Sequence, residues 1–161
     1  MSWYVRNMRD MKWWDCGPRG FVTELVDEEE PQVGANVFVL APGNPMAMYH
    51  WEADQEGFLV LSGEALLIVE DEERPLRQWD YFHCPPNVSH TIVGAGSGPC
   101  AILALGARID SVKEEGWGAY PYSELAMKHD ASAEEETTEP KVAYARFPAG
   151  KETAFQEGWL P

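Results

Sequence analysis

Short apolar runs separated by turn residues dominate the first two thirds of the chain. Runs rich in β-branched and aromatic residues recur at intervals of roughly 8 to 12 residues, with glycine, proline and acidic breaks between them, which is typical of an antiparallel sandwich or barrel. We therefore expect an all-β fold, either a sandwich or a barrel whose interior can hold a ligand. The predicted strands cover 21–26, 35–40, 46–52, 58–62, 64–70, 76–79, 81–84, 90–93 and 100–105.

The pattern changes beyond these strands, where short helical signals replace the apolar runs. Ser123 is placed to cap a helix over 124–128, and Thr138 to cap another that has Pro140 in its first turn. Residues 131–136 are acidic and lack large apolar groups, so we expect a solvated connector there. We predict one structural domain with three parts: N-terminal strands and an aromatic arm at 1–34, a barrel core at 35–107, and a C-terminal extension with short helices at 108–161.

Aromatic residues collect at both ends of the chain. The segment 1–14 contains three tryptophans and a tyrosine, and the segment 144–160 ends on Trp159 and Leu160. The tail has enough apolar surface to dock either on its own barrel or on that of a neighbour. We expect the two ends to pack across a two-fold interface, which predicts a homodimer.

Length and charge narrow the classes of partner. A chain of 161 residues is long enough to bury a core of its own, and its net charge of −15 repels phosphate backbones and anionic lipids. We therefore expect neither nucleic acid nor membrane as a partner. The N-terminus lacks the pattern of a signal peptide, and the three cysteines match neither a disulfide framework nor a zinc ribbon, so we predict a reduced, cytoplasmic protein.

Side chains that can bind a metal lie inside the predicted barrel. If 46–52 is a strand, the alternation of its side chains places His50 and Glu52 on one face. Glu56 follows after a short connector, and His90 follows a proline turn. Two imidazoles and two carboxylates can thus converge at one end of the barrel, above an apolar wall. The predicted metal ligands are His50, Glu52, Glu56 and His90, and the predicted pocket lining is Met46, Met48, Phe58, Val60 and Ile92.

In these residues the chain resembles the cupin superfamily, in its small single-domain, conserved-barrel form. The first cupin motif has two histidines one residue apart, a glutamate four residues on and a glycine seven further. Here His50, Glu52, Glu56 and Gly63 take those four places. The resemblance extends over about residues 35–106, nearly half of the chain, and it implies an all-β jelly-roll barrel, or double-stranded β-helix, and a metal site.

The second cupin motif, a glycine followed by a proline turn and a histidine, resembles the segment 79–90 with His90 at its end. Trp79 stands where a glycine is usual, and Asn87 stands where the turn glycine is usual. Asn87 is the milder departure, because asparagine tolerates the left-handed backbone region better than other residues that have a Cβ atom.

Glu52 is the departure that bears on chemistry, because a histidine is usual at its place. A carboxylate makes the site harder and more negative, which favours Zn, Mn, Fe or Ni over softer ions. Glu52 can be a fourth ligand, or it can stay unligated and act as a general base. If only one glutamate binds together with His50 and His90, the site has two histidines, one carboxylate and open positions.

Two classes of function fit these residues. As an enzyme, the chain would hold a divalent metal and a small oxygen-bearing ligand in the barrel, and dioxygenase, isomerase and decarboxylase chemistry all fit. As a binding or sensing module, the same pocket would recognise a small molecule without turnover, with or without a metal. A metal-free interaction protein is the third alternative. Whether the chain is an enzyme is left open by its sequence.

Overall fold

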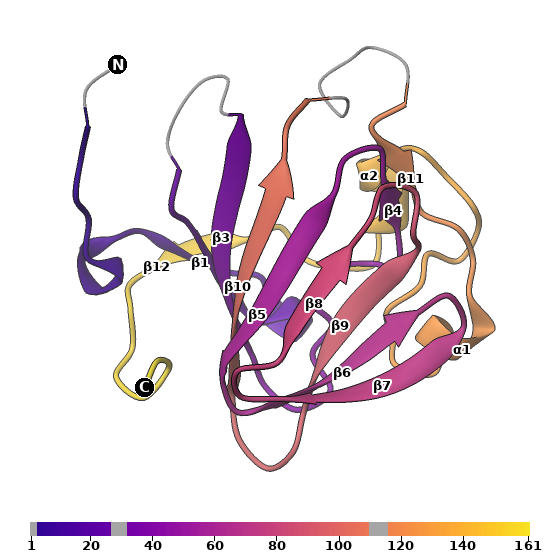
Figure 1. Cartoon of the computed structure of the whole chain (residues 1–161). Helices are drawn as coiled ribbons and strands as arrows, with labels where there is room; N and C mark the ends of the chain where they lie inside the picture. Colours follow the sequence, from indigo (N-terminus) through magenta and orange to yellow (C-terminus); the bar gives the residue numbers. More distant parts are fainter. Residues whose placement is uncertain (1–2, 27–31, 110–115) are drawn as a thin grey trace.

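The computed structural model describes residues 3–26, 32–109 and 116–161. Their strands form two facing sheets and a small third one (Figure 1), and every strand pair is antiparallel. The large sheet has the order β12 (Lys151–Thr153), β1 (Trp13–Asp15), β2 (Phe21–Glu24), β3 (Val33–Leu40), β10 (Cys100–Ala107), β5 (Glu56–Ser62) and β8 (Tyr81–Cys84). The second sheet has the order β7 (Glu72–Arg77), β6 (Glu64–Val69) and β9 (His90–Ala95). The small third sheet pairs β11 (Gly118–Ala119) with β4 (Trp51–Glu52). The prediction of an all-β jelly-roll barrel is confirmed.

Apolar side chains from both sheets fill the space between them. Within β5, for example, Phe58 and Val60 point inward and are almost completely buried, because side chains of a strand alternate between its two faces. This barrel core, the main source of hydrophobic stabilisation, consists of Leu40, Met46, Phe58, Val60, Ala65, Leu67, Cys84, Ile92, Cys100 and Ile102.

A tight reversal at Gly63 connects the two sheets. Gly63 has a φ of 75°, and a Cβ atom at this position would lie 2.5 Å from the carbonyl oxygen of Pro99. A side chain is therefore excluded here by the backbone conformation and by the neighbouring chain, which explains why the motif has glycine at this place.

The segment predicted as a strand at 46–52 is regular only at its end, in β4. Two isolated antiparallel bridges, Pro45 with Val93 and His50 with His90, hold the preceding residues against β9. Between these bridges the amide of Tyr49 donates to the carbonyl of Ala131 in the C-terminal extension instead, at 2.6 Å. The prediction of one continuous strand is therefore wrong, and side-chain alternation cannot be carried through the segment.

The C-terminal extension contains two short helices, α1 (Glu124–Met127) and α2 (Pro140–Ala143). Ser123 caps α1 as predicted, with its hydroxyl accepting from the amide of Ala126 at 3.2 Å. The prediction that Thr138 caps α2 is wrong, because Glu139 is the N-cap residue and no side chain caps the helix. Pro140 lies at its first position, where a missing amide proton costs nothing.

The expected solvated connector at 131–136 is exposed only in its second half. Ala131, Ser132 and Ala133 are buried, whereas the three glutamates that follow are exposed. The hydroxyl of Ser132 accepts from the amide of Ser123, so the connector is fixed against the start of α1. The described residues include no helix that is long and apolar enough to cross a membrane.

The aromatic ends pack against each other on the outer face of the large sheet. Trp13 is completely buried and lies 4.9 Å from Trp159 between ring centroids, and Phe155 contacts both rings. Strand β12 pairs with β1 along the same side (Figure 1). These rings therefore dock on their own barrel. Short 3₁₀ turns at Met8–Asp10 and Gly17–Arg19 flank β1.

Two positions where cupins usually have glycine adopt the left-handed backbone conformation. Trp79 has a φ of 74° and Asn87 a φ of 65°. Both turns have thus kept the conformation that suits glycine, although neither has the residue. The strain is larger at Trp79, because asparagine is one of the few residues with a Cβ atom that enters this region readily. The side chain of Trp79 is 67% exposed, so little packing offsets its strain.

Replacing Trp79 with glycine should stabilise the protein. Relief of the left-handed strain exceeds the extra chain entropy of glycine, so we expect Trp79→Gly to raise the free energy of unfolding by about 0.5–1 kcal/mol. Asn87→Gly is the matched comparison and should gain less. Urea denaturation of the three proteins measures both effects. A lower stability of Trp79→Gly would mean that the exposed indole contributes contacts that outweigh its strain.

Candidate metal centre

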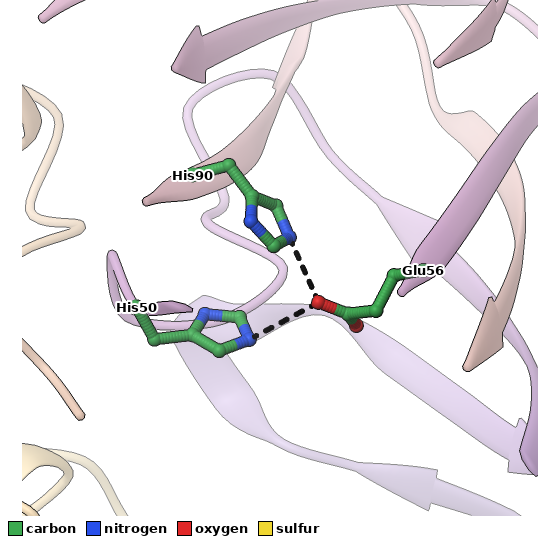
Figure 2. Close-up of side chains that lie close together, drawn as sticks. All are labelled: His50, Glu56 and His90. Carbon is green, nitrogen blue, oxygen red and sulfur yellow. Dashed lines mark ion pairs between the residues drawn. The ribbon is translucent and has the colours of Figure 1, made fainter. Parts of the chain in front are cut away.

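Three of the four predicted ligands meet at one end of the barrel (Figure 2). The ligand atoms of His50, Glu56 and His90 all lie within 4.8 Å of one another. His50 directly precedes β4, Glu56 is the first residue of β5, and His90 is the first residue of β9. The three side chains thus come from the ends of three separate strands, which the two sheets hold together.

Reciprocal backbone hydrogen bonds align the two histidines. The amide of His50 donates to the carbonyl of His90 at 3.1 Å, and the amide of His90 donates to the carbonyl of His50 at 2.8 Å. Residues paired in this way project their side chains to the same face of a ladder. The ring centroids are 4.9 Å apart as a result.

Backbone carbonyls also fix which ring nitrogen of each histidine is available. The Nδ1 atom of His50 lies 2.8 Å from the carbonyl oxygen of Met48, and the Nδ1 atom of His90 lies 3.1 Å from that of Val88. A carbonyl oxygen can only accept, so each Nδ1 carries the proton in the neutral ring. Both Nε2 atoms then present a lone pair toward Glu56. Carbonyl oxygens that accept from the other ring nitrogen orient histidine ligands in the same way in known metal sites.

The Nε2 atom of His90 is buried and has no hydrogen-bond partner among the described residues. It lies 3.3 Å from Oε2 of Glu56, but not in hydrogen-bonding geometry. The same oxygen is 4.0 Å from Nε2 of His50. Both separations are shorter than the about 4.4 Å that two ligands can span when each lies about 2.2 Å from one ion. The residues therefore fit a bound metal.

Burial and mutual charge shift the pKa values of all three groups. Desolvation raises the pKa of Glu56, to about 7, with Glu52 adding to the rise while His50 and Arg108 oppose it. For His50, burial lowers the pKa, but the nearby carboxylates of Glu52 and Glu56 outweigh it, so the pKa is raised. Burial and the nearby His50 lower the pKa of His90 to about 3. His90 is thus neutral near pH 7, ready to bind a cation.

Glu52 lies beside this group and not within it. Its Oε1 atom is 3.7 Å from Nε2 of His50, and its Oε2 atom accepts a hydrogen bond from Nη1 of Arg108 at 3.4 Å. The carboxylate is thus shared between the histidine and a cation at the rim. Its predicted roles, as a fourth ligand or as a general base, remain predictions.

Four of the five predicted lining residues lie in the barrel core. Phe58 is the one whose ring approaches the site, 5.2 Å from that of His90 between centroids, whereas Met46, Val60 and Ile92 fill the interior with the other core residues. Met48 differs, because it packs with Tyr120, Ala133 and Ala143 beneath the C-terminal extension. The break in strand alternation after Met46 explains why Met48 does not follow it into the barrel.

Sequence reasoning missed Arg108, Tyr120 and Tyr144. Tyr120 lies 5.9 Å from His50 between ring centroids, and the hydroxyl of Tyr144 accepts from the amide of Met48 at 3.1 Å. The two tyrosine rings pack edge to face and close the side of the site that faces the extension. Both lie far from the motifs in sequence, so no local spacing pointed to them. Arg108 follows the last barrel strand directly, which was the one available signal.

Comparisons with known proteins agree with this architecture. Residues 36–106 match the family model of the Cupin domain. A RmlC-like cupin from Shewanella frigidimarina aligns with a TM-score of 0.58 and 18% identity, over 67% of this chain and 93% of that one. A cupin 2 domain-containing protein from Halorhodospira halophila aligns with a TM-score of 0.53 and 19% identity, over 69% and 75%. Comparison with curated proteins gave no match.

A protein from Silicibacter pomeroyi, described as a sugar phosphate isomerase of the cupin superfamily, aligns with a TM-score of 0.52 and 23% identity. The alignment spans 63% of this chain and 62% of the length of that protein. At this identity the likeness concerns the fold alone. The match to the family model confirms the resemblance over residues 36–106, which form a cupin domain, and these structures show that the fold is shared.

Metal affinity should rise with pH through neutrality. The raised pKa values of Glu56, about 7, and of His50 mean that the metal-free site holds protons that a cation must displace. We expect the apparent affinity for Zn²⁺ or Mn²⁺ to fall by up to about tenfold per pH unit below pH 7 for each displaced proton. Calorimetric titration in buffers of different ionisation enthalpy measures the affinity and the released protons. A pH-independent affinity across pH 6 to 8 would contradict this charge arrangement.

Proposed function

We propose that this chain is a metal-dependent cupin in which His50, Glu56 and His90 hold one divalent transition metal. A small oxygen-bearing molecule binds beside the metal at the end of the barrel. The observation that carries the proposal is the buried, unpartnered Nε2 atom of His90, aimed at the carboxylate of Glu56. Leaving such an atom unpaired costs about 1–3 kcal/mol, a cost that a bound cation removes.

The donor set indicates the kind of ion. Two imidazoles and one carboxylate suit Zn, Mn, Fe or Ni, and they leave positions open for a ligand. When bound, such an ion acts as a Lewis acid that polarises a carbonyl or enolate oxygen. The protein's part is to hold the two histidines in one tautomer, to exclude water on the side of Phe58, and to present Glu52 at the rim.

Glu52 is suited to moving a proton next to the metal. One of its oxygens lies near His50 and the other is held by Arg108, so the carboxylate has a fixed position while part of it stays exposed. A positioned carboxylate within reach of a bound molecule is a general base. Isomerase, decarboxylase and dioxygenase chemistry all fit a metal with such a group beside it, and an isomerase would agree with the description of the S. pomeroyi protein.

A binding or sensing module without turnover is the alternative. It is favoured by the contact between Nε2 of His50 and Oε2 of Glu56 at 4.0 Å, since the raised pKa of His50 lets the two pair before any ion binds. To separate the two, the metal-loaded protein is incubated with small keto acids, diketones and sugars while product and O₂ uptake are followed. Thermal stabilisation by a compound that is never converted supports the binding module.

Metal content distinguishes the ligands from their neighbour. Replacing a residue that only orients a metal ligand weakens metal binding by about 10- to 100-fold. We expect His50→Ala, His90→Ala and Glu56→Gln each to weaken it by more than that. Glu52→Gln should stay within about tenfold of the wild type, because Glu52 lies outside the three-residue group. Elemental analysis after reconstitution and dialysis gives the stoichiometry of each protein.

His83→Ala is the matched control, because His83 is an exposed histidine on β8, outside the three-residue group. Its metal content should equal that of the wild type. A wild-type protein that takes up no transition metal would refute the metal-dependent proposal. Loss of metal from Glu52→Gln, equal to that of the histidine variants, would make Glu52 a fourth ligand.

A further inference from the structure

Arg108 is held rigidly at the mouth of the candidate metal centre. Its own amide donates to the carbonyl of Gln32 at 2.9 Å. The amide before it donates to the carbonyl of Gln55 at 3.0 Å, and the amide of Ile109 donates to the buried carboxylate of Asp54 at 2.9 Å. The backbone of Arg108 is thus attached to the short connector that separates Glu52 from Glu56.

Two glycines provide the space in which the guanidinium lies. Gly34 on β3 and Gly106 on β10 are direct partners in the sheet register. A Cβ atom at Gly34 would lie 2.9 Å from Nη2 of Arg108 and 3.1 Å from its Nε, and one at Gly106 would lie 3.5 Å from Nη1. Neither glycine has a positive φ, so their missing side chains make room and do not serve the backbone conformation.

The guanidinium has donors to spare. Among the described residues its side chain makes one hydrogen bond, to Oε2 of Glu52 at the long distance of 3.4 Å. A guanidinium offers five N–H donors in a planar fork, which matches the oxygens of a carboxylate or phosphate. The side chain of Arg108 is 33% exposed, whereas Glu52 beneath it is 15% exposed, so the cation is open to an incoming ligand.

We infer that Arg108 anchors an anionic oxygen group, a carboxylate or a phosphate, of the small molecule that binds beside the metal. The inference rests on the proposed metal-dependent function and names the substrate class for it. Glu52 positions Arg108 in the free protein and competes with the ligand for its donors. The ligand is then a small molecule with an anionic group at one end and a metal-binding oxygen at the other.

This role predicts effects of opposite sign on two affinities. A cation at the mouth repels the metal but attracts the anion, so its removal should tighten metal binding and weaken anion binding. Arg108→Gln should bind Co²⁺ about threefold to tenfold more tightly than the wild type does. The Co²⁺-loaded variant should bind inorganic phosphate or glycolate about tenfold to hundredfold more weakly, because charge-assisted hydrogen bonds are lost. A variant that merely disturbed the fold would weaken both.

The experiment is calorimetric titration of Co²⁺ into the metal-free protein, followed by phosphate, glycolate or imidazole into the loaded protein. Phosphate and glycolate distinguish the two anion sources, and imidazole is an uncharged metal ligand whose affinity should not change. Arg108→Lys keeps the charge and should bind both anions more tightly than Arg108→Gln. Arg77→Gln is the matched control, an exposed arginine on β7. Glu52→Gln should bind the anions more tightly than the wild type, since the competing carboxylate is neutralised.

The outcomes separate the two proposals. A wild-type protein that binds no Co²⁺ overturns both. A wild-type protein that binds Co²⁺, but whose affinities for phosphate and glycolate are unmeasurable or are unchanged in Arg108→Gln, overturns the role of Arg108 alone. Joint weakening of metal and anion binding in Arg108→Gln, with imidazole binding weakened too, assigns Arg108 a structural role and overturns the anchor.

Discussion

The pair of backbone hydrogen bonds between His50 and His90 is the interaction on which the site depends. It is an isolated bridge and not part of a continuous strand pair, yet it links the segment before β4 to the start of β9. Both imidazoles project from this one rung, and both are oriented by carbonyls two residues earlier in their own segments. The metal-binding geometry is therefore a property of the backbone, and the apolar core of the barrel keeps that backbone in place.

The surroundings of His90 are drier than those of Glu52. Phe58, Phe82 and the thiol of Cys84 enclose the His90 ring, and Cys84 lies 3.2 Å from its Nδ1 atom. Burial raises the pKa of the Cys84 thiol to about 12, so it is neutral at this place. Charge is instead concentrated at the rim, where Glu52 and Arg108 meet. The site thus has an apolar inner side that holds the imidazoles and an ionic outer side that meets solvent.

Local sequence patterns predicted those parts of the fold that interactions between residues close in sequence determine. Alternating apolar runs such as 81–84 and the cap at Ser123 appear where expected, because turn chemistry and period-two burial determine them. The pattern of 46–52 predicts one strand, but the amide of Tyr49 donates to a carbonyl of the C-terminal extension instead. A contact with a segment so distant in sequence cannot be predicted from a local pattern. Arg108 could not be predicted for the same reason, because its position depends on two glycines paired across β3 and β10. The motif spacing predicted that His50, Glu56 and His90 would lie together, and their ligand atoms are within 4.8 Å of one another. Spacing gave no sign that Arg108 would hold the carboxylate of Glu52.

The pairing of β1 with β12 has a consequence for the order in which the chain folds. Trp13 and Thr153 are register partners, so the segment between them must close a loop of about 140 residues, at an entropic cost near 4 kcal/mol that grows only slowly with length. During synthesis β1 has no partner on this edge until residues 151–153 have been made. The barrel interior can assemble before that moment, while the indole of Trp13 is still exposed to solvent. Sealing of the outer sheet face by Phe155 and Trp159 is thus a late, non-local step.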